Sequence, residues 1–265
     1  MIAAFFRDII VHRELLGSFV ARDLTSKYRG TFIGFFWNVI NPLVMLALYT
    51  FIFSVVLKVK FGTEGTTGNF ALYLFCGMVP WLAFSDSLNR GTSIIVAHHN
   101  LVKKTVFPLE ILPCYAVISG VVTECVGLGI LLVAAIAAAR GASMSLVILP
   151  LLIILQLLFT LGLAFFFSSM CVFFRDVMYF VGMMTTIWMF LTPIMYPETL
   201  FPERARFLLW LNPMAVLVGM FRDSVLEGNI PALWKVGAFA AWAFAAFAGG
   251  LFFFRKTKWE FADVI

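Results

Sequence analysis

Charged side chains are scarce in this sequence of 265 residues, because Asp, Glu, Lys and Arg together make up only 12% of it. Soluble globular domains carry about twice that share. Hydrophobic residues reach 62%, and a soluble domain of this length could not bury so much apolar surface. In a lipid bilayer this apolar surface needs no burial inside the protein, since apolar faces there point at lipid. The composition therefore predicts a polytopic integral membrane protein and excludes a soluble enzyme.

Residue sets that support catalysis or metal binding are also missing. The phosphate-binding loop G-x-x-x-x-G-K-[ST] does not occur, and no Ser/His/Asp or Cys/His set falls within a plausible extramembrane segment. His98 and His99 are adjacent without a third ligand nearby, and the four cysteines lie in or beside apolar runs without metal-ligand spacing. We expect no catalytic residue, metal or cofactor in this chain. Uphill transport would then take its energy from an ion gradient or a partner.

The formal net charge of +5 does not indicate a nucleic-acid partner, because Lys and Arg gather beside apolar segments as cytoplasmic loops require. With the N-terminus inside, most of these residues fall on the cytoplasmic side, so we expect both termini in the cytoplasm. The apolar runs predict six spanning helices, at 32–57, 70–90, 114–139, 145–173, 177–197 and 233–254. The expected fold is therefore all-α, with residues 32–265 forming the transmembrane domain.

Residues 1–31 follow a different pattern, in which apolar side chains recur at helical spacing and polar ones occupy another face. The apolar positions are Leu16, Phe19, Val20, Leu24 and Tyr28, and the polar positions are Arg13, Ser18, Arg22, Thr25 and Arg29. This periodicity predicts an amphipathic helix in the cytoplasmic interface, with Arg22, Tyr28 and Arg29 at the membrane surface. A simple charged anchor is the alternative.

The outer loop at 198–231 is expected to form a gate. Within it, residues 207–221 are apolar but short for a span, and Asn212-Pro213 interrupts them between flanking arginines. Two half-helices that enter the membrane from outside, as a re-entrant loop before the last span, fit this pattern better than a seventh span. We expect Trp210, Asn212 and Pro213 at the hinge of the gate.

A series of short motifs runs through the whole chain. They are Tyr28-Arg29, Gly34, Trp37, Asn41-Pro42, GMVPW at 77–81, NLVKKTVFPLEILP at 100–113, FRDV at 174–177, LTPIMYP at 191–197, NPM at 212–214 and FADVI at 261–265. In this order and spacing the chain resembles permease subunits of ABC-type polysaccharide exporters of the ABC-2 family. It looks most like O-antigen and lipopolysaccharide exporters, with capsule and teichoic acid exporters as relatives.

The resemblance implies a homodimer in a bacterial inner membrane, bound to two copies of a separate ATP-binding cassette subunit that holds ATP and Mg. It also implies a coupling element in the first large cytoplasmic loop and a second contact in the turn between spans four and five. The residues expected at these contacts are His98, Lys103, Lys104, Phe107, Glu110, Arg175 and Asp176. For Lys103 and Lys104 the alternative is that they only satisfy the positive-inside topology.

The resemblance further implies that the first and fifth spans line a channel between the two protomers, and both spans carry suitable stripes. Helical spacing places four residues of each span on one face. They are Asn38, Asn41, Met45 and Tyr49 in the first span, and Tyr179, Met183, Thr186 and Phe190 in the fifth. Sugar rings present C–H faces that stack on aromatic planes, so such stripes suit a sliding glycan. The alternative is that the aromatic side chains face lipid or the core.

Glu124, near the middle of the third span, is the main intramembrane charge. We expect it to pair with a polar group on a neighbouring helix, and a relay in an ion-coupled carrier is the alternative. The resemblance and the missing phosphate loop together predict the membrane subunit of an ATP-driven exporter of a lipid-linked polysaccharide, of O-antigen or capsule type. Rival classes are an ABC-2 exporter of drugs or small lipids, an ion-coupled carrier and a membrane enzyme. The identity of the glycan stays open.

Overall fold

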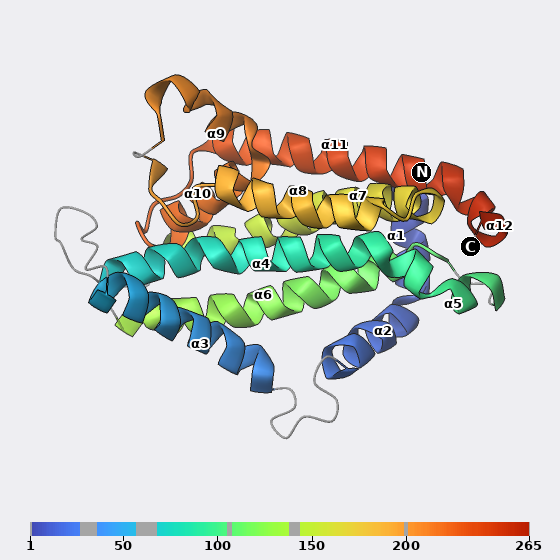
Figure 1. The fold of residues 1–265 in the computed structure, drawn as a ribbon, viewed down its shortest axis with the longest axis horizontal. Coiled ribbons are helices and arrows are strands. Elements are labelled where there is room, and N and C mark those ends of the chain that lie inside the picture. Colours follow the sequence, from blue (N-terminus) through green and yellow to red (C-terminus); the bar gives the residue numbers. More distant parts are fainter. Residues whose placement is uncertain are drawn as a thin grey trace.

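The computed structural model describes residues 2–26, 36–56, 68–104, 108–137, 144–198 and 201–264, and all regular secondary structure in these ranges is helical. The first half of the chain forms α1 (Ile2–Val11), α2 (Arg13–Ser26), α3 (Trp37–Thr50), the π-helix η2 (Phe51–Val56), α4 (Gly68–Ala97), α5 (His99–Lys104) and α6 (Ile111–Ala137). The second half forms the 3-10 helix η3 (Met144–Ile148), α7 (Leu149–Phe173), α8 (Val177–Leu191), η5 (Glu203–Ala205), α9 (Phe207–Leu211), α10 (Pro213–Val225), α11 (Leu233–Thr257), η6 (Lys258–Glu260) and α12 (Phe261–Val264). Figure 1 shows the long helices running side by side as one bundle.

Four helical segments in these ranges are long and apolar enough to cross a membrane, and they correspond to the second, third, fourth and sixth expected spans. Their bounds are Phe70–Ala97, Ile111–Ala137, Met144–Phe173 and Leu233–Val264. Each exceeds the roughly 20 residues that a spanning helix needs. The first of them continues beyond the expected boundary at 90, because Asn89 and Arg90 find partners on neighbouring helices instead of ending the helix.

The first and fifth expected spans correspond to shorter helices. The helix α3 has 14 residues and continues into the π-helix η2, with Pro42 inside it. The helix α8 has 15 residues, about 22 Å of rise, which is less than the hydrocarbon thickness of about 30 Å. It ends at Leu191, short of the expected boundary at 197, and the backbone at Thr192 is extended. Pro193 explains this end, since proline disfavours helical backbone at the residue before it.

Glycines let the helices of the bundle approach closely. A Cβ on Gly162 of α7 would overlap the backbone of Ala246 in α11, and a Cβ on Gly250 of α11 would overlap the Gly162 carbonyl. The helices α4 and α6 meet in the same way, because a Cβ on Gly120 would overlap the Ser87 hydroxyl. Membrane helices commonly associate through such small residues, since lipid provides no hydrophobic drive between them.

The centre of the bundle is aromatic, which accounts for part of the high phenylalanine content. Phe84 of α4 and Phe159 of α7 stack with ring centroids 5.9 Å apart, and Phe239 of α11 lies 5.7 Å from Phe159. Trp188 of α8 contacts Phe84 edge to face at 5.3 Å. Four helices that are distant in sequence therefore share one packed cluster.

Both chain termini lie at one end of the bundle together with α1, α5 and α12, and α9 and α10 lie at the other end (Figure 1). We call these the terminal end and the far end. Phe5 of α1 is buried at the terminal end, in edge-to-face contact with Phe165 of α7 and Phe247 of α11. The helix α1 is therefore anchored on the bundle.

The amphipathic pattern near the N-terminus produces a helix, α2, that packs on α6. Leu16 is buried, and the Phe19 ring stacks on that of Tyr115 at 5.3 Å. Arg22 of the same helix is exposed. Tyr28 and Arg29, also expected at this surface, lie outside the described residues.

Candidate functional site

One face of α8 presents the stripe that the sequence predicts. The exposed fractions of Tyr179, Met183 and Phe190 are 74%, 57% and 62%. Thr186, on the same face, is also exposed, whereas Val181 on the opposite face is fully buried against the bundle. No described element covers this face. It is a large apolar surface that a second subunit, a substrate or lipid can occupy.

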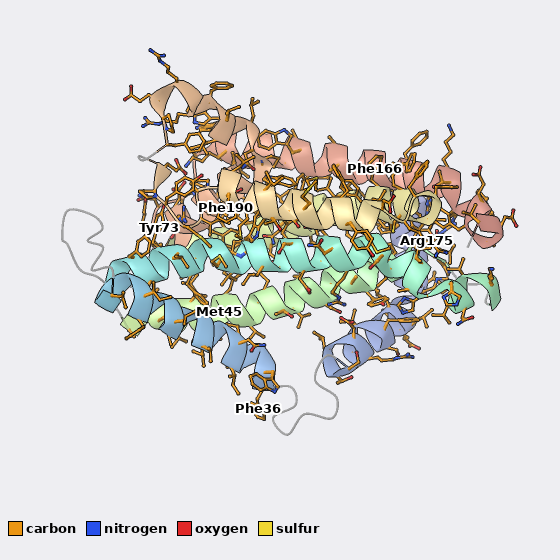
Figure 2. All side chains as sticks on the ribbon, in the orientation of Figure 1. Phe36, Met45, Tyr73, Phe166, Arg175 and Phe190 are labelled. Carbon is orange, nitrogen blue, oxygen red and sulfur yellow. The ribbon has the colours of Figure 1, made fainter. Side chains whose placement is uncertain are left out.

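Asn41 and Met45 of α3 line a cleft of about 650 Å³ between α3, α4 and α6. Met45 is labelled in Figure 2. The polar residues around the cleft are Asn41, Ser85, Asp86, Asn89, Thr123 and Glu124. The structure thus turns half of the predicted α3 stripe toward polar groups of α4 and α6. The side chains of Asn38 and Tyr49, the other half of that stripe, lie outside the described ones.

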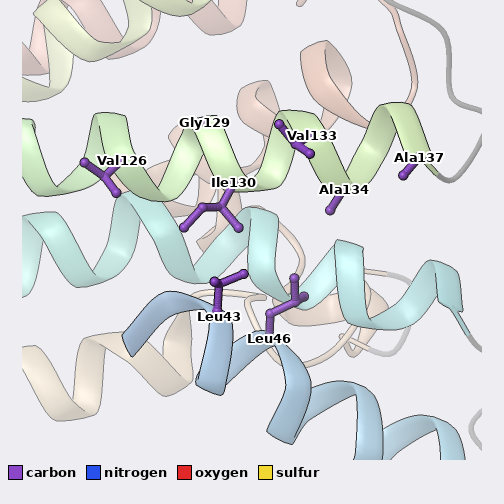
Figure 3. Close-up of a pocket in the computed structure, with 8 residues that line it drawn as sticks. All are labelled: Leu43, Leu46, Val126, Gly129, Ile130, Val133, Ala134 and Ala137. Carbon is purple, nitrogen blue, oxygen red and sulfur yellow. The ribbon is translucent and has the colours of Figure 1, made fainter. Parts of the chain in front are cut away.

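A second hollow beside this cleft has a purely apolar lining. Figure 3 shows its residues, which are Leu43 and Leu46 of α3, with Val126, Gly129, Ile130, Val133, Ala134 and Ala137 of α6. Its volume is about 400 Å³. The helix α3 therefore meets α6 through aliphatic side chains at this level, and its polar residue Asn41 points to the neighbouring cleft.

Glu124 is buried in α6 with an exposed fraction of 2%, and its polar partner on a neighbouring helix is Gln156 of α7. The Gln156 Nε2 donates to Glu124 Oε2 at 3.0 Å and to the Pro80 carbonyl of α4 at 3.0 Å. This pair links three helices at the centre of the bundle. The second oxygen, Glu124 Oε1, has no hydrogen-bond partner among the residues that the structure describes.

The polar row of α4 continues toward α2 and α8. The Arg90 guanidinium lies 2.6 Å from an Asp23 oxygen of α2 and 3.3 Å from an Asp86 oxygen one turn away. The Asn89 Nδ2 donates to the Thr185 hydroxyl of α8 at 3.3 Å. Side-chain bonds of α4 therefore connect the cleft to both the amphipathic helix α2 and the helix with the exposed aromatic stripe, α8.

Three of the residues expected to contact an ATPase are exposed. Arg175 and Asp176 lie in the turn between α7 and α8, at the terminal end of the bundle (Figure 2). Lys103 is exposed on α5, at the same end. The side chain of Lys104, and Phe107 as a whole, lie outside the described part of the chain.

Glu110 is buried and His98 is half-buried, whereas we expected both to contact the ATPase at the surface. The His98 Nε2 lies 3.2 Å from the Tyr115 hydroxyl, within hydrogen-bond distance. Glu110 has an exposed fraction of only 3%, and its Oε1 accepts from Arg255 Nε at 3.2 Å and from Lys258 Nζ at 2.9 Å. Glu110 is therefore enclosed by its ion pairs, whereas His98 bonds Tyr115 and keeps part of its surface exposed.

The Glu110 ion pairs extend to the N-terminus, because the Arg255 Nη2 also lies 3.1 Å from an Asp8 oxygen of α1. One network therefore joins α1, the start of α6 and the C-terminal helices. Sequence reasoning missed it, since 145 residues separate Glu110 from Arg255 and no local pattern marks the pairing.

At the far end, Asn212 joins α8 to α10. Its Oδ1 accepts from Trp188 Nε1 at 2.7 Å and caps α10 by accepting from the amide nitrogens of Met214 and Ala215 at 3.0 and 3.3 Å. Its Nδ2 donates to the Thr192 hydroxyl at 3.1 Å. The break predicted at Asn212 is thus a firm junction between two helices.

The other predicted gate residues flank this junction. Pro213 is the first residue of α10, where its missing amide proton costs nothing. Trp210 of α9 is exposed, and its ring lies 5.3 Å from that of Trp234 at the start of α11. The short helix α9 is therefore bound by one aromatic contact on its exposed side, whereas α10 is largely buried.

Arg222 of α10 is a functional candidate that we expected only as a flanking charge. It is buried, and its guanidinium donates to the carbonyls of Pro193 and Ile194 at 2.6 and 2.9 Å. It also lies 3.6 Å above the Tyr73 ring of α4. The guanidinium holds the turn after α8 in place. A Cβ on Gly77 would come within 2.9 Å of the Arg222 Nη2, so α4 leaves room for the guanidinium there. An arginine inside an apolar stretch was the available signal.

The long apolar helices are those of a multi-pass membrane protein, and the polar cleft and the exposed aromatic face suit a transporter. Comparison with known proteins identifies the family: residues 14–226 match the ABC-2 type transporter family, so the chain belongs to that family. The O-antigen export system permease protein RfbA of Myxococcus xanthus is 33% identical over 261 residues, which are 98% of each chain. Two proteins of the same name from Klebsiella pneumoniae are each 28% identical over 95% of both chains. The resemblance inferred from motif order is confirmed.

Proposed function

We propose that this chain is the membrane subunit of an ATP-driven ABC exporter that moves a lipid-linked polysaccharide of O-antigen type across a bacterial inner membrane. The observation that carries the proposal is its similarity to O-antigen export permeases over nearly the whole of both chains. The aromatic stripe on α8 and the polar cleft beside α3 support it, because a glycan needs C–H stacking surfaces and hydroxyl partners.

Six membrane crossings, with both termini cytoplasmic, form the proposed topology. An even number of crossings agrees with both termini lying at one end of the bundle (Figure 1). The 14 residues of α3 and the 6 of η2 together make 20, which is long enough for a crossing. The turn after α8 completes the fifth crossing, and α9 and α10 form a re-entrant pair from outside. The helix α2 lies in the cytoplasmic interface, with Arg22 toward the lipid head groups.

The working unit is a homodimer with two ATP-binding cassette subunits, which bind ATP and Mg and carry out hydrolysis. The exposed face of α8 supports a second protomer, since its large side chains have no cover in the described part of one chain. Facing stripes from two protomers would enclose a path between them. This chain then contributes the path and no catalytic group.

Movement of the ATPase would reach the channel through the terminal end. Arg175 and Asp176 immediately precede α8, so a push on this turn acts along the stripe helix. The bond from Asn89 to Thr185 carries that motion to α4, and the pair of Arg90 with Asp23 carries it to α2. At the far end, the turn held by Arg222 and the Asn212 junction would move α10 and open the outer gate.

A lipid extraction from cells that lack this chain tests the proposal. Lipid-linked glycan should accumulate inside while surface polysaccharide disappears, and the intact gene should reverse both changes. Cells lacking the partner ATPase serve as the matched control and should show the same accumulation. Normal surface glycan with no accumulation would overturn the polysaccharide substrate and favour an exporter of drugs or small lipids.

A further inference from the structure

The polar cleft between α3, α4 and α6 has the size and lining of a ligand site. Its volume of about 650 Å³ lies within the usual range for small-molecule pockets. Phe75, Met78 and Met45 provide apolar walls, and carboxylate, amide and hydroxyl groups converge on it from α3, α4 and α6. We propose that this cleft binds one neutral, hydroxyl-rich sugar unit of the exported glycan before it enters the path along α8. The inference rests on the proposed function.

Glu124 provides the observation that points to a ligand. The carboxylate is buried, lines the cleft and is fixed by the bond from Gln156 to Oε2. Its Oε1 has no partner among the described residues, and a buried acceptor without a partner costs free energy. A sugar hydroxyl in the cleft would donate to this oxygen and remove that cost.

The charge of the cleft selects the part of the substrate that enters it. Asp86 and Glu124 are both acidic, and the nearby Arg90 guanidinium already bonds Asp23 and Asp86. No described lining residue is a cation, so a phosphate group would meet Asp86 without a counter-charge, whereas hydroxyl groups find acceptors. The cleft therefore fits a neutral sugar and not the phosphate that joins a glycan to its lipid.

The position of the cleft connects binding to the channel helix. Asn89 lines the cleft and also donates to Thr185, on the buried face of α8. A sugar that bonds the Asn89 amide competes with or reorients this link. A sugar bound in the cleft would thus change the contact between α4 and α8 through the Asn89 side chain.

Filling the cleft tests the proposal in cells that display surface glycan only through this chain. Thr123→Phe places a ring in the cleft, and Val126→Phe places the same ring in the apolar hollow on the same helix. At equal membrane levels, we expect Thr123→Phe to lower surface glycan by about tenfold and Val126→Phe to lower it by less than about twofold. Equal effects of the two variants would overturn the sugar site. Failure of the unaltered gene to restore surface glycan would instead overturn the proposed function.

Protection of a cysteine provides a readout that does not depend on transport. In a Cys125→Ser background, Asp86→Cys places a thiol in the cleft, and Glu203→Cys places one at the far end. N-ethylmaleimide labelling is compared in membranes with and without accumulated lipid-linked glycan, using an ATPase variant that cannot hydrolyse ATP. We expect the glycan to slow labelling at position 86 only. Unchanged labelling at that position would overturn the proposal, as would equal slowing at both positions. Slowing by sodium chloride in glycan-free membranes would also overturn it, by showing a cation site.

Discussion

Asn212 makes the connection between α8 and α10 with both ends of one amide. Its oxygen accepts from an indole and two backbone amides, and its nitrogen donates to Thr192. Few residue types can replace it, because both a donor and an acceptor are required at once. The side chain therefore fixes how the last turn of α8 meets the helix that follows the outer loop.

Replacing this residue tests the junction. Asn212→Ala removes the helix cap and the partner of Trp188, so we expect a loss of about 1–2 kcal/mol in stability. The measurement is the temperature at which the detergent-solubilised protein loses its monodisperse peak. Asn212→Asp keeps the acceptor oxygens, so its stability should lie between those of the wild type and Asn212→Ala. A stability equal to wild type for the alanine variant would contradict the assigned role.

At the scale of helices, the crossing of α7 and α11 depends on two glycines that leave no room for a side chain. Gly250 faces Gly162 across the contact, whereas a Cβ added to the adjacent Gly249 would meet nothing within 4 Å. Adjacent residues of one helix thus have opposite tolerance for a side chain.

The two positions give a matched pair of variants. Gly250→Leu must separate the helices, and we expect a loss of about 3 kcal/mol or more, with a low yield of folded protein. Gly249→Leu should express and denature like wild type, because the added side chain points into open space. Similar behaviour of both variants in expression and thermal denaturation would show that the crossing is wrong.

The ion pairs of Glu110 join α1, the start of α6 and the C-terminal helices at the terminal end, where the proposed ATPase contacts also lie. Glu110→Gln keeps the shape but weakens the bonds to Arg255 and Lys258, each worth about 2 kcal/mol when one partner is charged. We expect intact assembly with the ATPase, a lower melting temperature and a reduced ratio of glycan exported to ATP hydrolysed. Glu260→Gln, exposed on the neighbouring 3-10 helix, is the control and should leave this ratio unchanged.

The apolar runs of the sequence predicted the four long helices of 27 to 32 residues, because an apolar segment in a bilayer has little choice but to be helical. Sequence periodicity also placed Tyr179 and Phe190 on one exposed face of α8. It could not predict pairs that fold from distant segments, such as Glu110 with Arg255 or Arg222 with the turn at Pro193. Pairing across 28 to 145 residues depends on helix packing, which no local spacing reveals.

At the scale of the whole molecule, one chain presents an aromatic face that lacks a cover in its described part and places both termini together. The proposed homodimer would explain the first feature, because the α8 stripes of two protomers would face one another. Cysteine cross-linking tests this arrangement. In a Cys125→Ser background, Met183→Cys should form a disulfide-linked dimer in membranes after mild oxidation, while Ala245→Cys, exposed on α11, should stay monomeric. Dimer formation by Ala245→Cys alone would place the interface on another face.

ATP-driven movement of glycan tests the central claim most directly. Inside-out membrane vesicles are prepared from cells that have accumulated radiolabelled lipid-linked glycan, and ATP is added together with an externally applied glycosidase. The account predicts that ATP makes the labelled glycan resistant to the enzyme when the intact chain and its ATPase are present, and that a vesicle without this chain shows no protection. Protection without the chain, or protection driven by an ion gradient in the absence of ATP, would contradict an ATP-driven exporter built on this subunit.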